Sequence, residues 1–144
     1  MSDAGRISLT YTASSDIDSK AGGGMFALRL KDGKSVWNTP APPCGDRPRC
    51  SPAQSAAVSA IPGIAFSGSI DGHLRAYSAA DGKIVWDFDT IRKYETVNGV
   101  SANGGSLDGP GAAIAGGMLV VNSGYAGSGG MPGNVLLAFS VDGK

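Results

Sequence analysis

One carboxylate is a candidate for chemistry because of the residues around it. Asp108 lies in the stretch Ser-Leu-Asp-Gly-Pro, directly before a small-residue segment at 110–115 that favours an inner β-strand. A carboxylate in that position could accept a proton or bind a metal cation. The alternative is local, because an Asp before Gly109 and Pro110 is also typical of an Asx turn. Further polar residues are expected at the same end of the fold, each either a ligand contact or a group that satisfies its own loop: Gln54, Arg92, Asn98 and Asn122.

The two cysteines and the single histidine have structural and chemical alternatives. Cys44 and Cys50 enclose five residues, among them Gly45 and Pro48, and could close a small disulfide loop or remain two free thiols. Two cysteines are too few for a structural zinc site, which needs four ligands. His73 lies on an expected strand, where it is either a polar surface or inter-sheet group or a catalytic base.

Composition and charge exclude several function classes. Lys and Arg number 12, as do Asp and Glu, so bulk charge does not favour binding to nucleic acid or to a membrane surface. No apolar run approaches the ~18 residues of a membrane-spanning helix, and the first residues lack the features of a signal peptide. The glycine-rich stretch 124–133 has no nucleotide-binding register and no helix after it. We therefore expect a cytosolic chain, or a piece of a longer protein whose export signal lies elsewhere.

A repeated hairpin supplies the elements that would position these residues. Residues 71–88 have the pattern of two short strands around an Asp-Gly turn. The motif Ala-x-x-x-x-Asp-Gly-Lys-x-x-Trp spans 76–86 and also 27–37, at an offset of 49. A third copy begins at Ala138 and reaches Asp-Gly-Lys at 142–144 with one residue fewer. Repeats of about this period with strands inside them are typical of β-propeller blades.

The predicted fold class is all-β, a partial β-propeller of about two and a half four-stranded antiparallel blades. Residues 1–144 form a single propeller segment, with a partial blade at 1–37, a complete blade at 55–88 and a partial blade at 110–144 that lacks its outer strand. Residues 55–61 are expected to form an inner strand, and no helix is expected. The longer loops, at 14–23, 38–54, 89–109 and 124–133, should gather at one end of the scaffold, where sites usually lie.

The motif resembles the tryptophan-docking motif of the pyrroloquinoline quinone (PQQ) dehydrogenase propellers, in which the Trp stacks on the turn of the neighbouring blade. Trp37 and Trp86 are therefore expected to be structural docking residues. Stretches at 96–100, 105–110, 121–125 and 132–139 resemble the C-terminal part of polyvinyl-alcohol-dehydrogenase-like quinoproteins. The resemblance covers roughly residues 22–144.

In such enzymes PQQ lies over the ring axis with a bound Ca²⁺, and an Asp acts as base while the quinone accepts hydride from an alcohol. The resemblance implies that this chain is the C-terminal segment of a periplasmic or secreted PQQ-dependent alcohol dehydrogenase that oxidises a small alcohol or polyol. The candidates at its cofactor-binding rim are Asp108, which could pair with a quinone-binding arginine, together with Asn98, Arg92, Gln54 and Asn122.

The partners implied are the remaining blades of a longer parent, because a closed ring typically needs about four to eight blades. The family's calcium ligands and catalytic Asp are expected in other blades. We therefore expect the isolated chain to lack dehydrogenase activity and to associate through its unpaired edge. The alternative is a non-enzymatic PQQ-like propeller that acts as a protein-binding scaffold, as in the outer-membrane assembly lipoproteins with the same repeat.

Overall fold

The computed structural model is built of antiparallel strands. The structure describes residues 6–8, 23–124 and 129–141, and no helix occurs among them. None of these residues therefore forms a helix long and apolar enough to cross a membrane. The predicted all-β fold class is confirmed. The expected loop at 14–23, apart from its last residue, and the third Asp-Gly-Lys turn at 142–144 lie outside the described residues.

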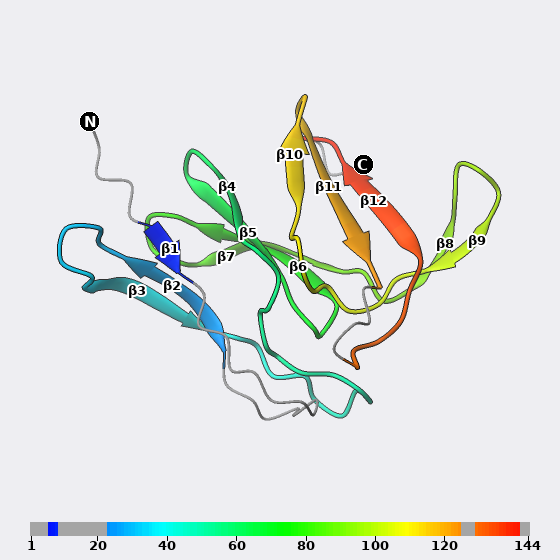
Figure 1. The fold of residues 1–144 in the computed structure, drawn as a ribbon, viewed down its shortest axis with the longest axis horizontal. Helices are drawn as coiled ribbons and strands as arrows, with labels where there is room; N and C mark the ends of the chain where they lie inside the picture. The colour runs from blue at the N-terminus through cyan, green and yellow to red at the C-terminus, as the bar shows by residue number, and fades with distance from the viewer. Residues whose placement is uncertain (1–5, 9–22, 125–128, 142–144) are drawn as a thin grey trace.

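Three sheets follow one another along the chain, and in each the strands lie in chain order (Figure 1). The first sheet contains β1 (Arg6–Ser8), β2 (Gly24–Leu28) and β3 (Ser35–Pro40). The second contains β4 (Ser59–Ile61), β5 (Ile64–Gly68), β6 (His73–Ser78) and β7 (Ile84–Asp89). The third contains β10 (Ala113–Ala115), β11 (Met118–Ser123) and β12 (Val135–Phe139). A separate hairpin is formed by β8 (Lys93–Glu95) and β9 (Ser101–Asn103).

The second sheet is packed on both faces, because alternate residues of a strand point to opposite sides. Leu74 on β6 is fully buried against an apolar cluster shared with the third sheet. Tyr77, on the other face of the same strand, is fully buried with Met25 of the first sheet. The three sheets therefore stack side by side in chain order, as blades of a propeller do.

The repeated turn of the motif makes the contact between the first and second sheets. The indole of Trp37 lies against Gly82, so close that a Cβ atom placed there would be 2.4 Å from the ring. Its Nε1 donates a hydrogen bond to the carbonyl oxygen of Ala79 at 3.0 Å. Trp86, at the equivalent position of the second sheet, packs edge-on against Phe139 of the third sheet with 5.3 Å between ring centroids. Both tryptophans therefore join their own sheet to the next one.

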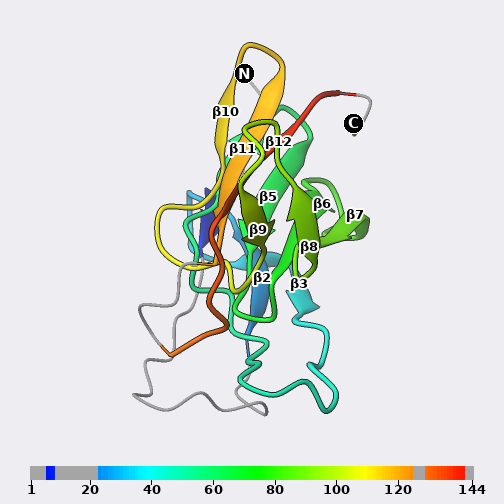
Figure 2. The ribbon, with the colours of Figure 1, turned by 90° about the vertical axis from the view of Figure 1, so that its right-hand side faces the viewer.

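The two ends of the stack differ, although the stretch 89–109 does not stay at the expected loop end, since its β8–β9 hairpin projects to the side of the stack (Figure 1). The tight turns at 62–63 and 79–83 meet, since the Ala79 amide donates to the carbonyl oxygen of Gly63. The connections at 41–54 and 129–134 gather at the opposite end (Figures 1 and 2). The strands thus form a scaffold that presents its long loops on one side.

Two segments differ from the sequence prediction. The inner strand β4 begins at Ser59 and not at residue 55. The residues before it pair with loops instead of a strand, because the Ala53 carbonyl accepts the amide of Ile70 and the Ala57 amide donates to Gly109. The second difference is the β8–β9 hairpin, which lies inside the stretch expected to be a loop at 89–109. Each of its strands has only three residues, which is too short for an alternation signal.

The Gly82→Ala variant tests the docking contact, and Gly33→Ala is its matched control. Both glycines occupy the same motif position with φ near +70°, but a Cβ on Gly33 meets nothing within 4 Å. Both variants should lose about 1 to 2 kcal/mol of unfolding free energy from the left-handed backbone. Gly82→Ala should lose about 1 to 3 kcal/mol more, because the methyl group displaces the Trp37 ring. Chemical denaturation of the intact protein measures both, and equal losses would contradict the docking contact.

Candidate functional site

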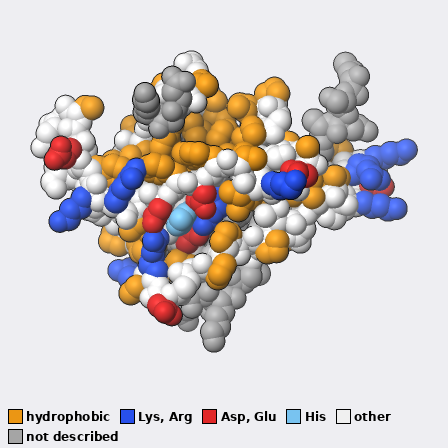
Figure 3. All heavy atoms as spheres, turned by 180° about the vertical axis from the view of Figure 1, so that it is seen from behind, with side chains coloured by type: hydrophobic (Ala, Val, Ile, Leu, Met, Phe, Trp, Pro, Cys, Tyr) orange, Lys and Arg blue, Asp and Glu red, His pale blue; other side chains and the backbone are white. Residues whose placement is uncertain are grey.

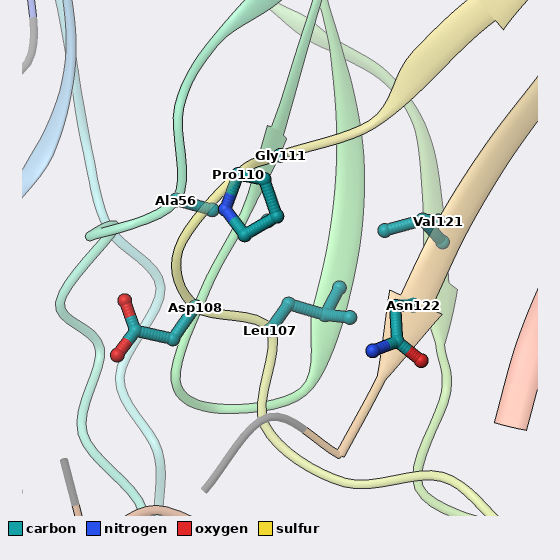
Figure 4. A pocket seen from close by; sticks show the side chains of 8 residues that line it. Ala56, Leu107, Asp108, Pro110, Gly111, Val121 and Asn122 are labelled. Carbon is teal, nitrogen blue, oxygen red and sulfur yellow. The ribbon is translucent and has the colours of Figure 1, made fainter. Parts of the chain in front are cut away.

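Asp108 and Asn122 both line a small pocket between the second and third sheets (Figure 4). Asn122 is exposed, however, and it alternates with the buried residues Val121 and Ser123, so its side chain lies on the face of the third sheet turned away from the second. Asp108 is half-buried at the start of the segment that leads into β10, and a carboxylate oxygen accepts the Gly109 amide at 2.7 Å. In Figure 4 its carboxylate points away from Asn122, with Leu107 between the two. The remaining walls are small or apolar: Ala56, Gly68, Pro110, Gly111 and Val121.

The size of this pocket limits what it can hold. Its volume is about 20 Å³, whereas pockets that enclose small-molecule ligands measure about 300 to 1,000 Å³. This pocket therefore does not fit a whole tricyclic quinone. It fits one group of a ligand, or a contact at the rim of a larger site.

Gln54 lies elsewhere, between the first and second sheets. Its side chain is buried, and Nε2 donates a hydrogen bond to the hydroxyl of Tyr77 at 2.5 Å. Its Oε1 is buried, and none of the residues that the structure describes hydrogen-bonds to it. Burial raises the pKa of Tyr77, although the hydrogen bond with Gln54 and the charge of Arg75 oppose the rise. The structure therefore places Gln54 in the interior of the sheet stack and not in the Asp108 pocket.

Arg92 and Asn98 belong to the β8–β9 hairpin. The guanidinium of Arg92 is exposed and lies over the ring of Phe88, 4.3 Å from its centroid. The side-chain oxygen of Asn98 accepts the hydroxyl of Thr96 at 2.6 Å and the amide of Val100 at 3.3 Å. Asn98 thus stabilises the hairpin tip. Of the five predicted rim residues, the structure brings only Asp108 and Asn122 into one pocket.

A second polar cluster, not predicted from the sequence, lies on the face of the second sheet that carries Tyr77. The buried guanidinium of Arg75 donates from Nη2 to Asp71 at 2.6 Å and from Nε to Asp87 at 3.1 Å. Burial alone would lower the pKa of Arg75, but the hydrogen bond with Asp71 and the charges of Asp71 and Asp87 raise it. Antiparallel register places Arg75 opposite Asp87 and His73 opposite Asp89. Alternating charges on two consecutive strands were the signal that could have revealed this cluster.

The cluster reaches the surface through His73. Its Nδ1 lies 2.6 Å from Asp87 and its Nε2 lies 3.8 Å from Asp89. Figure 3 shows the single imidazole at the surface between acidic and basic side chains. Arg47 completes the cluster as its outermost charge, because its Nη2 donates a hydrogen bond to Asp89 at 2.7 Å. Partial burial alone would raise the pKa of Asp89, but the hydrogen bonds from Arg47 and from the Ile91 amide lower it.

Arg47 lies inside a disulfide loop, because Cys44 and Cys50 are bonded with their Cα atoms 6.0 Å apart. Disulfides of this kind persist in oxidising compartments. Among the residues that the structure describes, no group of three or more His, Cys, Asp or Glu side chains is arranged to hold a metal ion. The described part of the chain therefore offers paired charges and a small pocket, and not a complete calcium site.

Two curated relatives match nearly the whole chain. A polyvinylalcohol dehydrogenase from a Pseudomonas species is 51% identical over 148 residues, which cover 93% of this chain and 23% of the relative. A polyvinylalcohol dehydrogenase from Sphingopyxis sp. strain 113P3 is 46% identical over 160 residues, which cover 99% of this chain and 24% of the relative. The chain therefore spans about a quarter of the length of these relatives. No protein-family model matches the sequence.

Solved structures show the same fold. The quinohemoprotein alcohol dehydrogenase ADHIIG from Pseudomonas putida HK5 aligns with a TM-score of 0.53 at 26% identity, covering 72% of this chain and 14% of that one. BamB from Moraxella catarrhalis aligns with a TM-score of 0.57, covering 84% of this chain and 33% of that one. Because the identity is only 19%, this likeness shows the fold alone. The sequence resemblance to PQQ-dependent dehydrogenase-like propellers is confirmed.

The Arg47→Met variant tests the outer part of the charged cluster through its pH dependence. Because the folded-state pKa of Asp89 is lowered, its contribution to stability is complete above the unfolded pKa and is lost as the pH falls through the folded pKa. The variant should be less stable than the wild type by about 0.5 to 1 kcal/mol at pH 7, since the pair is partly exposed. This difference should shrink below about pH 3.9.

Urea denaturation of the intact protein at pH 7 and pH 3 measures the difference. Arg29→Met is the control, because Arg29 forms an ion pair with Asp32 in an exposed turn, and this variant should show little change at either pH. A difference for Arg47→Met that is the same at both pH values would contradict the assignment.

Proposed function

Because the chain has the sequence and the fold of the PQQ-dependent dehydrogenase-like propellers, we propose that it is a segment of an alcohol dehydrogenase of this kind. The observation that carries the proposal is the 46–51% identity to polyvinylalcohol dehydrogenases over more than nine-tenths of the chain. The substrate class is then an alcohol or polyol, which the whole protein oxidises.

In this proposal the segment contributes blades and rim loops, and the complete ring holds the cofactor. PQQ would supply the hydride acceptor when bound there, with Ca²⁺ beside it. The pocket beside Asp108 does not fit the whole cofactor, so no step of the reaction is assigned to its residues. Asp108 and Asn122 are proposed as rim contacts, because both line the pocket formed where the chain leads into β4 and β10. Asp108 is the stronger candidate, since Asn122 pairs with Leu136 on the face turned away from the second sheet. The side chains of Gln54, Arg92 and Asn98 make internal contacts instead.

The remaining blades are the partners, and the repeat indicates which face receives the next one. Ala138 lies 62 residues after Ala76, and the same offset of 62 places Leu136 at the position of Leu74. Leu74 is fully buried against the third sheet, whereas Leu136 is 70% exposed. Leu136 lies opposite Asn122 in register, on the face of the third sheet turned away from the second. We propose that a further blade of the parent covers this face.

The disulfide supports an oxidising compartment, which agrees with a periplasmic or secreted parent. The alternative function, a protein-binding propeller without a cofactor, rests on the likeness of fold to BamB alone. The two functions differ in whether the intact protein uses a quinone.

The activity prediction concerns the intact protein supplied with PQQ and Ca²⁺. It should oxidise polyvinyl alcohol or a short polyol with an artificial electron acceptor, and only when PQQ is present. Asp108→Asn should lower kcat/KM by about tenfold, which corresponds to the loss of one hydrogen bond at the rim. Asn98→Ala is the control and should leave kcat/KM unchanged, because Asn98 contacts only its own hairpin. No PQQ-dependent oxidation by the intact wild type would favour the scaffold function.

The blade-interface prediction concerns Leu136. Leu136→Lys should destabilise the intact protein by about 2 to 4 kcal/mol, because a charge would be buried against the neighbouring blade. Val85→Lys is the control, since Val85 is 56% exposed with both neighbouring sheets present. Thermal and chemical denaturation measure the loss, and equal small effects of the two variants would show that no blade covers Leu136.

A further inference from the structure

The disulfide-closed ring at residues 44–50 carries two arginines whose side chains contact different parts of the fold. Arg47 donates from Nη1 to the carbonyl oxygen of Asp71 at 3.0 Å and from Nη2 to Asp89 at 2.7 Å, both at the loop end of the second sheet. Arg49 donates from Nε and Nη2 to the carbonyl oxygen of Gly129 at 3.2 and 3.1 Å. Gly129 lies in the segment that leads into β12 of the third sheet. We propose that this ring is a clamp that fixes the segment at 129–131 relative to the second sheet.

The backbone of Arg49 supports a positioning role for the ring. Its φ is 55°, and among the described residues it is the only one other than glycine with a positive φ. Residues with a Cβ rarely adopt this conformation, and they keep it only where the surroundings impose it. The short covalent ring and the two hydrogen bonds to Gly129 impose it here.

The clamp extends beyond Gly129 to the stretch before Asp108. The amide of Ser106 donates to the carbonyl oxygen of Met131 at 2.8 Å, and the amide of Met131 donates to Oγ of Ser106 at 2.8 Å. The backbones pack closely, since a Cβ on Gly105 would lie 2.3 Å from the Met131 oxygen. Arg49 therefore holds the strand-like contact between 129–131 and 104–106. A role of the clamp in positioning Asp108 for activity rests on the proposed function, whereas the clamp as a structural contact does not.

The test measures local opening by hydrogen–deuterium exchange of the intact protein, with peptides that cover 104–109 and 129–134. Arg49→Asn removes the guanidinium and keeps a residue that tolerates positive φ. A double variant, Cys44→Ser with Cys50→Ser, opens the ring and leaves both arginines in place. Arg29→Asn is the control, because its guanidinium pairs with Asp32 inside its own turn.

The clamp predicts that amides of both peptides exchange about tenfold faster in Arg49→Asn and in the double variant, which is the effect of losing one charge-assisted hydrogen bond on local opening. A peptide covering β5 should keep its wild-type rate, and Arg29→Asn should change none of them. Unchanged exchange at 104–109 and 129–134 would overturn the proposal. Equal acceleration everywhere, β5 included, would also overturn it, because the ring would then be a general stabiliser. These outcomes are independent of enzymatic activity.

Discussion

The structure depends on the burial of β6 from both sides. Leu74 and Tyr77 are both fully buried, on opposite faces of β6. A single sheet cannot bury its own two faces, so another layer must pack on each of them. The third sheet covers Leu74, and Met25 of the first sheet lies against Tyr77. Sheets with two apolar faces must stack, and the stack continues until every face is covered. A ring of blades is the arrangement in which no face is left at the end.

The repeated Asp-Gly-Lys turn serves this stacking in a way that a hairpin alone does not require. Gly33 and Gly82 both have positive φ, so both turns need glycine for the backbone. At Gly82 the missing side chain also makes room for the indole of Trp37. The same residue type therefore closes a hairpin and admits the neighbouring sheet. This double role explains why the tryptophan and the turn recur together at one spacing in the sequence.

The sequence predicted the features that depend on local pattern, and it missed those that depend on neighbours in space. The motif spacing was sufficient for the sheets and for the positions of Trp37 and Trp86. It did not reveal that Gln54 is buried against Tyr77, because no local pattern marks a polar loop residue that folds under a neighbouring sheet. The β8–β9 hairpin was missed because three-residue strands carry no measurable period. The rim pocket needed the packing of two sheets before Asp108 and Asn122 could be placed together.

The charged half of the interface explains how loops gain a fixed position on such a stack. A buried ion pair such as Arg75 with Asp71 adds little net stability compared with an apolar pair. Removing one partner, however, strongly destabilises the protein, because the other charge is left buried and uncompensated. It therefore favours one arrangement of the chain over close alternatives. Through Asp89 the same cluster binds Arg47, and so paired charges place the disulfide loop at the end of the second sheet where β6 begins and β7 ends. Apolar packing thus determines the order of the sheets, and paired charges determine where the loops above them lie. The pocket beside Asp108 depends on such packing, because its lining comes from two sheets and from the connections between them.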